Sequence, residues 1–317
     1  MSKSVFINRD DMVTVNAEGA EKAREIYISL FDYLRDVKAN VVAKRPVDIE
    51  SAYLLIKTLV DEPALIQSIF PLTLKDNIEK DYMVTHQANV AVCALKLGLG
   101  LEYTALQLLD LGVVSLIHDL GIWNIPDDIL NKESPLMAAE LGMVRDHSRI
   151  GKDILASFER ERPWLPEVVY QHHERGNGTG YPRGFCMNEM HDYATLICFV
   201  DAYEGMTHHR PIRRAMKWNL TARELIAEFK DSAFPADIIK SFLKEITIYP
   251  EGCHVLLNNK FVCEVVTINR DNPLRPDVRV VMDHSGRKVR EDKIIRLIDS
   301  PIYNIMDCVS LDEIKKA

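Results

Sequence analysis

Four residues in two adjacent pairs are the best candidates for chemistry in this sequence. His118 and Asp119 follow directly after an apolar run at residues 111–117, and His172 and His173 precede a glycine-spaced turn. Burying several ionisable groups together is unfavourable unless another charge pairs with them. Two such pairs beside apolar segments therefore indicate the ligands of a metal site.

Three further residues on other apolar segments could complete that site: His86, His147 and Asp201. A lone histidine on an apolar helix is more often a satisfied core residue than a ligand. This alternative stays open for His86 and His147 when each is taken alone. The other histidines stand beside polar or turn residues and are expected to have structural roles: His191, His208, His209, His254 and His284.

The types of these side chains indicate which metals they would bind. Imidazole and carboxylate donors without thiolates disfavour a structural zinc site and favour an open catalytic site holding iron, manganese or zinc. Five histidines and two aspartates exceed the needs of one ion, so we expect two divalent ions bridged by one aspartate. Two neighbouring metals suit displacement at phosphorus, because they activate a water and stabilise charged oxygens.

The candidate ligands fall on five predicted helices, and metal sites in helical bundles are built by such convergence. Apolar residues at helical spacing predict the helices of this region. They are expected over residues 86–99, 101–120, 136–158, 167–173, 193–207 and 221–229.

The flanking segments have different patterns. Residues 18–39 and 49–70 have helical spacing, after a weak strand at 13–15. Alternating apolar residues predict strands at 254–257, 261–267 and 278–282. The expected fold class is mainly α. A helical metal-binding bundle over residues 71–250 would follow a small α-rich accessory or regulatory domain at 1–70 and precede a short β extension at 251–317.

The composition indicates a globular protein that binds any anion through a local site. Hydrophobic residues make up 47% of the chain, and the formal charge is −8, which gives no attraction to polymeric nucleic acid. None of the six cysteines forms a CxxC pair, which favours free thiols. No secretory signal is visible, and no apolar run reaches the roughly 18 residues needed to span a bilayer, so we expect a cytoplasmic protein without a membrane segment.

Taken together, these motifs resemble the HD-GYP domain, a branch of the HD metal-dependent phosphohydrolases. The resemblance covers about residues 80–300. It rests on His118 with Asp119, on residues 125–132, on His147, and on residues 172–182 with their His-His and Gly-Tyr-Pro signature. It implies hydrolysis of the bacterial second messenger cyclic di-GMP at a binuclear metal centre.

Position by position, the resemblance assigns roles to particular residues. It implies that the metal ligands are His86, His118, Asp119, His147, His172, His173 and Asp201. Asp119 would bridge the two ions, and Arg210 would contact a substrate phosphate, a task that suits a bidentate guanidinium. Gly180, Tyr181 and Pro182 would belong to a loop that borders the substrate and binds GGDEF-domain partners.

Three positions depart from the family pattern. Ile122 replaces a lysine that faces the phosphate, and a lost charge-assisted contact is worth roughly 1.5–3 kcal/mol. Tyr82 replaces a glutamate that helps some members to hold a third metal, and Glu79 lies nearly two turns from His86, so two metals are expected. Asn177 replaces an aspartate of the loop but permits the same turn.

Two functions follow as alternatives. The intact set of ligands favours an active cyclic di-GMP phosphodiesterase. Ile122 favours a degenerate module that binds metals, and the nucleotide or GGDEF-type partners, with little or no catalysis. A phosphohydrolase for another nucleotide is a more distant alternative, because a fold does not fix a function.

Overall fold

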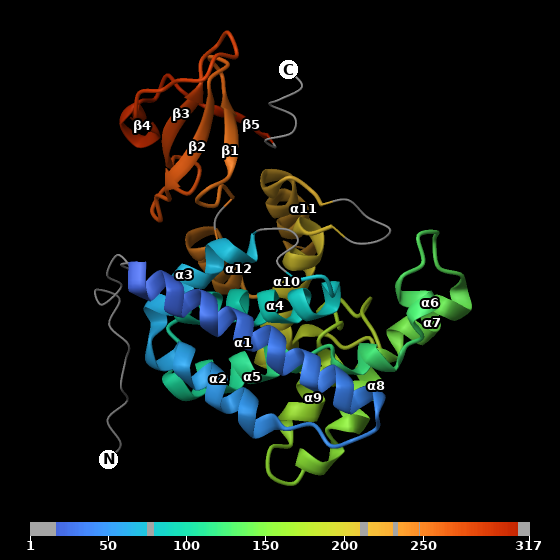
Figure 1. The fold of residues 1–317 in the computed structure, drawn as a ribbon. Helices are drawn as coiled ribbons and strands as arrows, with labels where there is room; N and C mark the ends of the chain where they lie inside the picture. Colours follow the sequence, from blue (N-terminus) through green and yellow to red (C-terminus); the bar gives the residue numbers. More distant parts are fainter. Residues whose placement is uncertain (1–16, 75–78, 210–214, 231–233, 247, 310–317) are drawn as a thin grey trace. The chain divides into compact units, whose positions relative to one another are not determined.

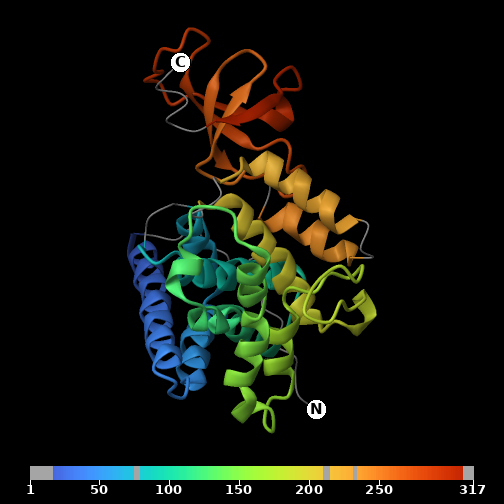
Figure 2. The same cartoon turned by 90° about the vertical axis from the view of Figure 1, so that its right-hand side faces the viewer.

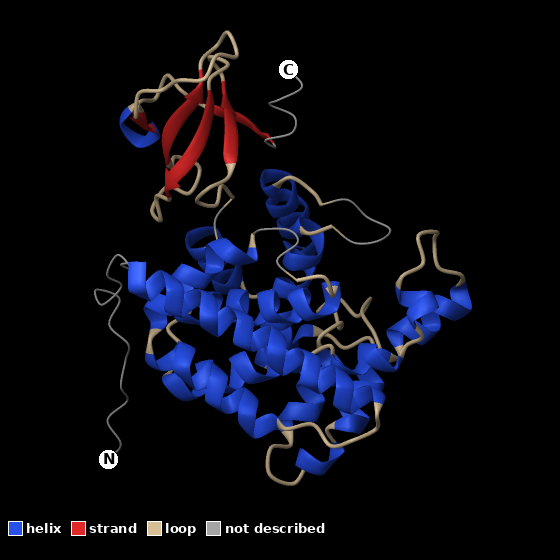
Figure 3. Cartoon of the chain, in the orientation of Figure 1, coloured by secondary structure: helices blue, strands red, loops and turns tan. Residues whose placement is uncertain are grey.

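A computed structural model describes residues 17–74, 79–209, 215–230, 234–246 and 248–309. The predicted strand at 13–15 lies outside these residues. The described chain divides into two compact units, one within Met1–Ala215 and Ala227–Pro235 and the other within Met216–Ile226 and Ala236–Ala317. Helices dominate the first unit, and the strands gather near the carboxyl end of the chain (Figure 3). The expected mainly-α fold class is confirmed.

Three helices open the first unit: α1 (Ala17–Val42), α2 (Ile49–Asp61) and α3 (Pro63–Thr73). The helix expected over 49–70 is divided at Glu62, because Pro63 begins a new helix at its first position. α1 and α2 lie side by side (Figures 1 and 2), and all three helices pack against α4 or α5. A separate accessory domain at 1–70 stays a prediction, since this segment shares a compact unit with the histidines.

The core of the first unit is the packed pair of α4 (Tyr82–Gly100) and α5 (Ala105–Ile117). α4 begins where Asp81 accepts a hydrogen bond from the Met83 amide, and Thr104 with Gln107 forms a capping box at α5. The segment Ala105–Asn124 is long and apolar enough to cross a membrane, but 72% of its apolar stretch is buried inside the protein. A core helix of a globular protein meets the same criterion.

The first unit also contains η2 (Leu120–Asn124), α6 (Asp127–Leu130), α7 (Ala138–Arg145), α8 (His147–Ile154), η3 (Ala156–Phe158), α9 (Trp164–Gln171), η4 (Met187–Glu189) and α10 (Asp192–Thr207). The single helix predicted over 136–158 is wrong. The His147 ring hydrogen-bonds the Val144 carbonyl, which a continuous helix would pair with the amide of Ser148. The break turns the His147 side chain toward the other histidines.

The second unit contains α12 (Ala236–Glu245), the first part of α11 (Trp218–Lys230) and an antiparallel sheet. The strand order is β4-β3-β2-β1-β5. The strands are β1 (His254–Leu257), β2 (Val262–Thr267), β3 (Asp277–Met282), β4 (Ile294–Arg296) and β5 (Ile305–Val309). One sheet face buries alternate residues, such as Val255, Cys263 and Val280. The three predicted strands are present, and the sequence patterns did not reveal β4 and β5.

Candidate metal centre

The seven side chains predicted as ligands converge in the first unit, mostly from the ends of helices. The helices that supply them are α4 for His86, the end of α5 for His118 and Asp119, the start of α8 for His147, the end of α9 for His172 and His173, and α10 for Asp201. All are buried except His173, whose side chain is 18% exposed. Convergence of this kind is the expected geometry of a bundle metal site.

The ligand atoms form two groups that share Asp119. Atoms of Asp119, His147, His172 and His173 lie within 4.8 Å of one another, and so do those of His86, His118 and Asp119. Asp119 Oδ1 lies 3.0 Å from His147 Nε2 and 3.3 Å from His172 Nε2. Its Oδ2 lies 3.6 Å from His86 Nε2 and 3.7 Å from His118 Nε2. One oxygen therefore faces each group.

Asp201 also reaches toward both groups. Its Oδ1 lies 3.1 Å from His86 Nε2, and its Oδ2 lies 3.5 Å from His173 Nδ1. The two aspartates thus stand between the same two sets of imidazoles, with one carboxylate oxygen turned each way.

Backbone carbonyls fix the orientation of three imidazoles. The Nδ1 atoms of His118, His147 and His172 hydrogen-bond the carbonyl three residues earlier, at 2.8, 2.6 and 2.6 Å. Because a carbonyl only accepts, each ring carries its proton on Nδ1 and directs the Nε2 lone pair into the cluster.

This arrangement brings acceptors face to face. His147 Nε2 and His172 Nε2 lie 3.2 Å apart, and the buried His118 Nε2 has no hydrogen-bond partner among the described residues. Lone pairs of nitrogen and carboxylate oxygens that point at one another need a cation between them. The donor set therefore fits metal ions.

A carboxylate rather than a carbonyl orients the fourth imidazole. His86 Nδ1 hydrogen-bonds Glu204 Oε2, while Asn89 donates to Glu204 Oε1 at 3.0 Å and the Tyr82 hydroxyl donates to Oε2 at 3.3 Å. Glu204 is 1% exposed and lies three residues after Asp201 on α10. Sequence reasoning missed Glu204, although this three-residue spacing puts both carboxylates on one helix face.

The environment shifts the pKa values of these groups in opposite directions. Burial lowers the pKa of His118 to about 4 and so favours the neutral ring that metals bind. Burial also opposes charge on His86, but the carboxylates of Glu204 and Asp201 raise its pKa to about 10. Burial works against the charged form of Asp119, yet the neighbouring His118 and His147 hold its pKa well below its usual range.

A buried carboxylate holds the loop after the histidine pair. Glu174 is 1% exposed and accepts hydrogen bonds from the Arg183 amide at 2.6 Å and the Phe185 amide at 2.9 Å. Sequence reasoning did not identify this role of Glu174. These two hydrogen bonds therefore hold the far end of the loop against Glu174, the residue that directly follows the two histidines.

The Gly-Tyr-Pro signature packs closely against the backbone of Glu174 and Arg175. A Cβ at Gly180 would lie 2.2 Å from the Arg175 amide nitrogen, so only glycine fits there. The next residue, Tyr181, places its ring centroid 4.7 Å from that of His173. Pro182 follows Tyr181 in the lining of a surface pocket. The loop thus packs against His173, the most exposed of the candidate ligands.

The positions that depart from the family pattern have definite places. Ile122 is 5% exposed in η2, and Tyr82 contacts Glu204 instead of offering a carboxylate. Glu79 pairs with Arg35. The predicted phosphate contact Arg210 lies outside the described residues, so its role stays a prediction.

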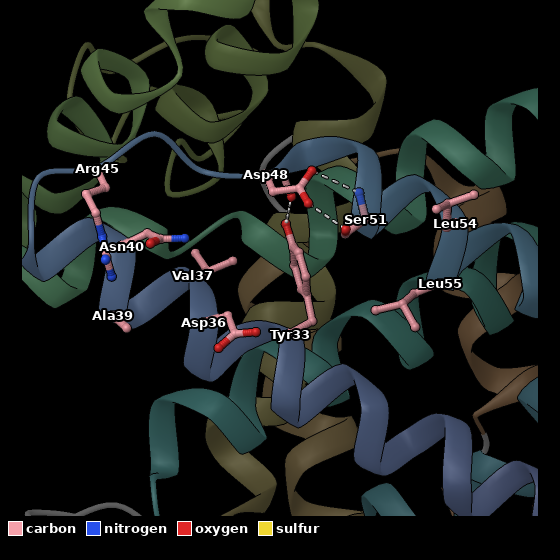
Figure 4. Close-up of a pocket in the computed structure, with 10 residues that line it drawn as sticks. All are labelled: Tyr33, Asp36, Val37, Ala39, Asn40, Arg45, Asp48, Ser51, Leu54 and Leu55. Atoms are coloured by element: carbon pink, nitrogen blue, oxygen red, sulfur yellow. Dashed lines mark hydrogen bonds between the residues drawn. The ribbon is translucent and has the colours of Figure 1, made fainter.

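A pocket of about 570 Å³ opens at the junction of α1 and α2, and Figure 4 shows ten residues that line it. None of them is a candidate metal ligand. The Tyr33 hydroxyl donates to the Asp48 carbonyl at 3.0 Å, and the Asp48 carboxylate accepts from the Ser51 amide at 3.2 Å. These hydrogen bonds stabilise the start of α2, where Asp48 is the N-cap residue.

Comparisons with known proteins agree with this geometry. Residues 75–233, half of the chain, match the HD domain family, and residues 254–317 match a KOW domain associated with HD domain. A cyclic di-GMP phosphodiesterase of Pseudomonas aeruginosa is 33% identical over 199 residues, covering 62% of this chain and 47% of that protein. Another, from Borreliella burgdorferi, is 23% identical over 205 residues, covering 65% of this chain and 54% of that protein.

A solved structure shares the fold. An HDG"Y"P protein from Bdellovibrio bacteriovorus matches with a TM-score of 0.57 over 72% of each chain, at 17% identity. The chain spans about half the length of the curated relatives described above. On the family match and the converging histidines and aspartates, this chain belongs to the HD domain family.

Proposed function

We propose that this protein is a phosphodiesterase that hydrolyses cyclic di-GMP at a binuclear metal centre, in bacterial second-messenger signalling. The observation that carries this proposal is Asp119, which turns one carboxylate oxygen toward each group of histidines. The names of the two relatives support cyclic di-GMP as the substrate class.

The described residues divide between two ions. His147, His172 and His173 would hold one, and His86 and His118 the other, with Asp119 shared and Asp201 reaching toward both. Imidazole and carboxylate donors favour iron, with manganese or zinc as alternatives. Two such ions supply an activated water and neutralise the charge that develops on the phosphodiester.

The chain's own residues would orient the reactants. The carbonyls behind His118, His147 and His172 fix the imidazole lone pairs before any substrate arrives. His173 is the most exposed ligand, so the substrate would approach from the side of His173 and Tyr181. Arg210, Gly180 and Pro182 keep their predicted substrate or partner roles, and GGDEF-domain partners and a cytoplasmic location also remain predictions.

The second candidate is a module that binds metals with little or no catalysis. One observation favours it: Ile122 is apolar and 5% exposed, so it offers a phosphate no charge. The ligands would be unchanged in such a module, and only the turnover would differ.

The test is to purify the protein without oxygen, measure metal per chain, and assay cyclic di-GMP cleavage. The variants are Ile122→Lys, Ile122→Met as its apolar control, and His172→Ala. Two metals per chain with sustained cleavage by the wild type support the enzyme. Cleavage only after Ile122→Lys supports the non-catalytic module, and a His172→Ala variant that keeps both metals contradicts the ligand assignment.

A further inference from the structure

A pocket of about 460 Å³ opens beside the metal ligands, between α7 and the end of the signature loop. Met143, Arg145, Asp146, Tyr181 and Pro182 are among the residues that line it. The Tyr181 ring is in contact with the cluster: its centroid lies 4.7 Å from that of His173 and 6.4 Å from that of His147. His173 is the most exposed of the candidate ligands, so a molecule in this pocket would lie next to the open side of the metal centre, in contact with the Tyr181 ring.

Arg145 gives the pocket a positive charge. Its guanidinium carbon lies 5.2 Å from the centroid of the Tyr181 ring, a cation–π contact that holds the exposed side chain over the loop. Among the residues that the structure describes, no carboxylate forms an ion pair with Arg145.

The neighbouring charges are already paired. Asp146, in the same pocket, accepts from Arg149 Nε at 2.8 Å and from Arg149 Nη2 at 2.5 Å. Lys132 lies 2.6 Å from Glu140. The pocket is thus locally cationic, although the chain as a whole carries a formal charge of −8.

We propose that Arg145 binds a phosphate of the substrate at the open side of the metal centre. This inference rests on the proposed function and adds a residue that the sequence patterns did not single out. A guanidinium offers a planar fork of donors that fits two phosphate oxygens at once. Because Ile122 supplies no charge, Arg145 carries electrostatic recognition on the face that Tyr181 borders.

Arg145→Ala tests the role through binding as well as turnover. The probe for binding is a phosphorothioate analogue of cyclic di-GMP, which resists cleavage, titrated into the metal-loaded protein by calorimetry. We expect affinity for the analogue to fall about 10- to 100-fold and KM to rise similarly, with kcat changing less. Arg145→Lys keeps the positive charge but loses the planar fork of donors, so its affinity for the analogue should lie between those of the wild type and Arg145→Ala.

The matched control is Lys57→Ala, which removes one exposed positive charge from α2. It should bind and cleave as the wild type does. Metal per chain and the thermal midpoint are measured for every variant, and both should be unchanged in Arg145→Ala.

Three outcomes overturn the proposal. If Arg145→Ala binds the analogue as tightly as the wild type, the inference fails while the proposed function stands. If Arg145→Ala loses metal, its role is structural and the inference fails. If the metal-loaded wild type neither binds the analogue nor cleaves cyclic di-GMP, the proposed function falls and this inference falls with it.

Discussion

Each imidazole of the cluster whose Nε2 points inward is held by a second group on its opposite nitrogen. For His118, His147 and His172 that group is the carbonyl three residues earlier in the chain, so the hydrogen bond depends only on the local backbone. For His86 it is Glu204, which belongs to another helix. The orientation of His86 therefore depends on a tertiary contact that one substitution can remove.

Glu204→Gln should weaken metal binding about 10- to 100-fold, the usual effect of losing a group that orients a ligand. An amide keeps the shape of the side chain but loses the charge that favours the hydrogen bond from His86 Nδ1. Competition with a graded series of chelators measures the change as metal retained per chain.

The control for that experiment is Glu245→Gln, which changes a glutamate of the second unit that is 4% exposed. It should leave metal affinity as in the wild type. If Glu204→Gln retains metal as well as Glu245→Gln does, Glu204 does not position His86.

The sequence was sufficient to predict the candidate ligands but not the residues that support them. Histidines and aspartates on apolar segments stand out, because burying them needs a reason. Glu204 and Glu174 did not stand out, because only tertiary contacts show that these glutamates are buried and hydrogen-bonded. Arg145 was missed for the same reason, because only its packing on Tyr181 distinguishes it from other surface arginines.

At the level of elements, a close approach between η2 and α8 places His147 beside Asp119. Gly121 follows Asp119 by two residues, and a Cβ at this position would lie 2.0 Å from the His147 carbonyl oxygen and 2.6 Å from the Gly151 amide nitrogen. No flexible side chain can yield there, because both neighbours are backbone atoms. The glycine therefore sets the spacing between the two elements.

Gly121→Ala should push α8 away from η2, destabilise the protein by about 1–3 kcal/mol, and reduce metal retention. Urea unfolding measures the stability, and metal per chain measures the site. Gly142→Ala in α7 is the matched control: a Cβ there meets nothing within 4 Å, so stability should hold or rise by up to about 1 kcal/mol. If Gly121→Ala and Gly142→Ala have the same stability and the same metal per chain, the close approach between η2 and α8 is contradicted.

Apolar periodicity predicted the long helices well and the short elements poorly. α4 and α10 match the expected ranges because their apolar residues recur at helical spacing along the whole element. The break between α7 and α8 left no trace in that pattern, since it comes from the His147 side chain taking a backbone carbonyl. β4 was missed because its three residues are too few to show an alternation.

At the scale of the whole molecule, both aspartates and all five histidines of the cluster belong to one compact unit, and the sheet belongs to the other. The sequence indicated the helical and β-rich regions from the change of period near Gly252. It could not show that α1 to α3 pack on α4 and α5, because that depends on which apolar faces meet.

Metal removal should therefore destabilise the first unit. A ligand present at 100 times its Kd stabilises the native state by about 2.7 kcal/mol, which corresponds to a rise in Tm of about 5–10 °C for domains of 150–250 residues. We expect chelation to lower the Tm of the wild type by about that amount.

Two variants make that thermal experiment specific. In His172→Ala, the chelator should lower the Tm much less than in the wild type. His284 is an exposed histidine of the second unit, so in His284→Ala the chelator should lower the Tm as much as in the wild type. A chelator shift that is identical in wild type and His172→Ala would place the metal elsewhere.

The most direct test of the account is the number of metal ions per chain in anaerobically prepared protein, measured by mass spectrometry for the wild type and for Asp119→Asn. A carboxylate that faces both histidine groups predicts two ions in the wild type and at most one after the substitution. One ion or none in the wild type, or two ions retained by Asp119→Asn, would contradict a binuclear centre bridged by Asp119.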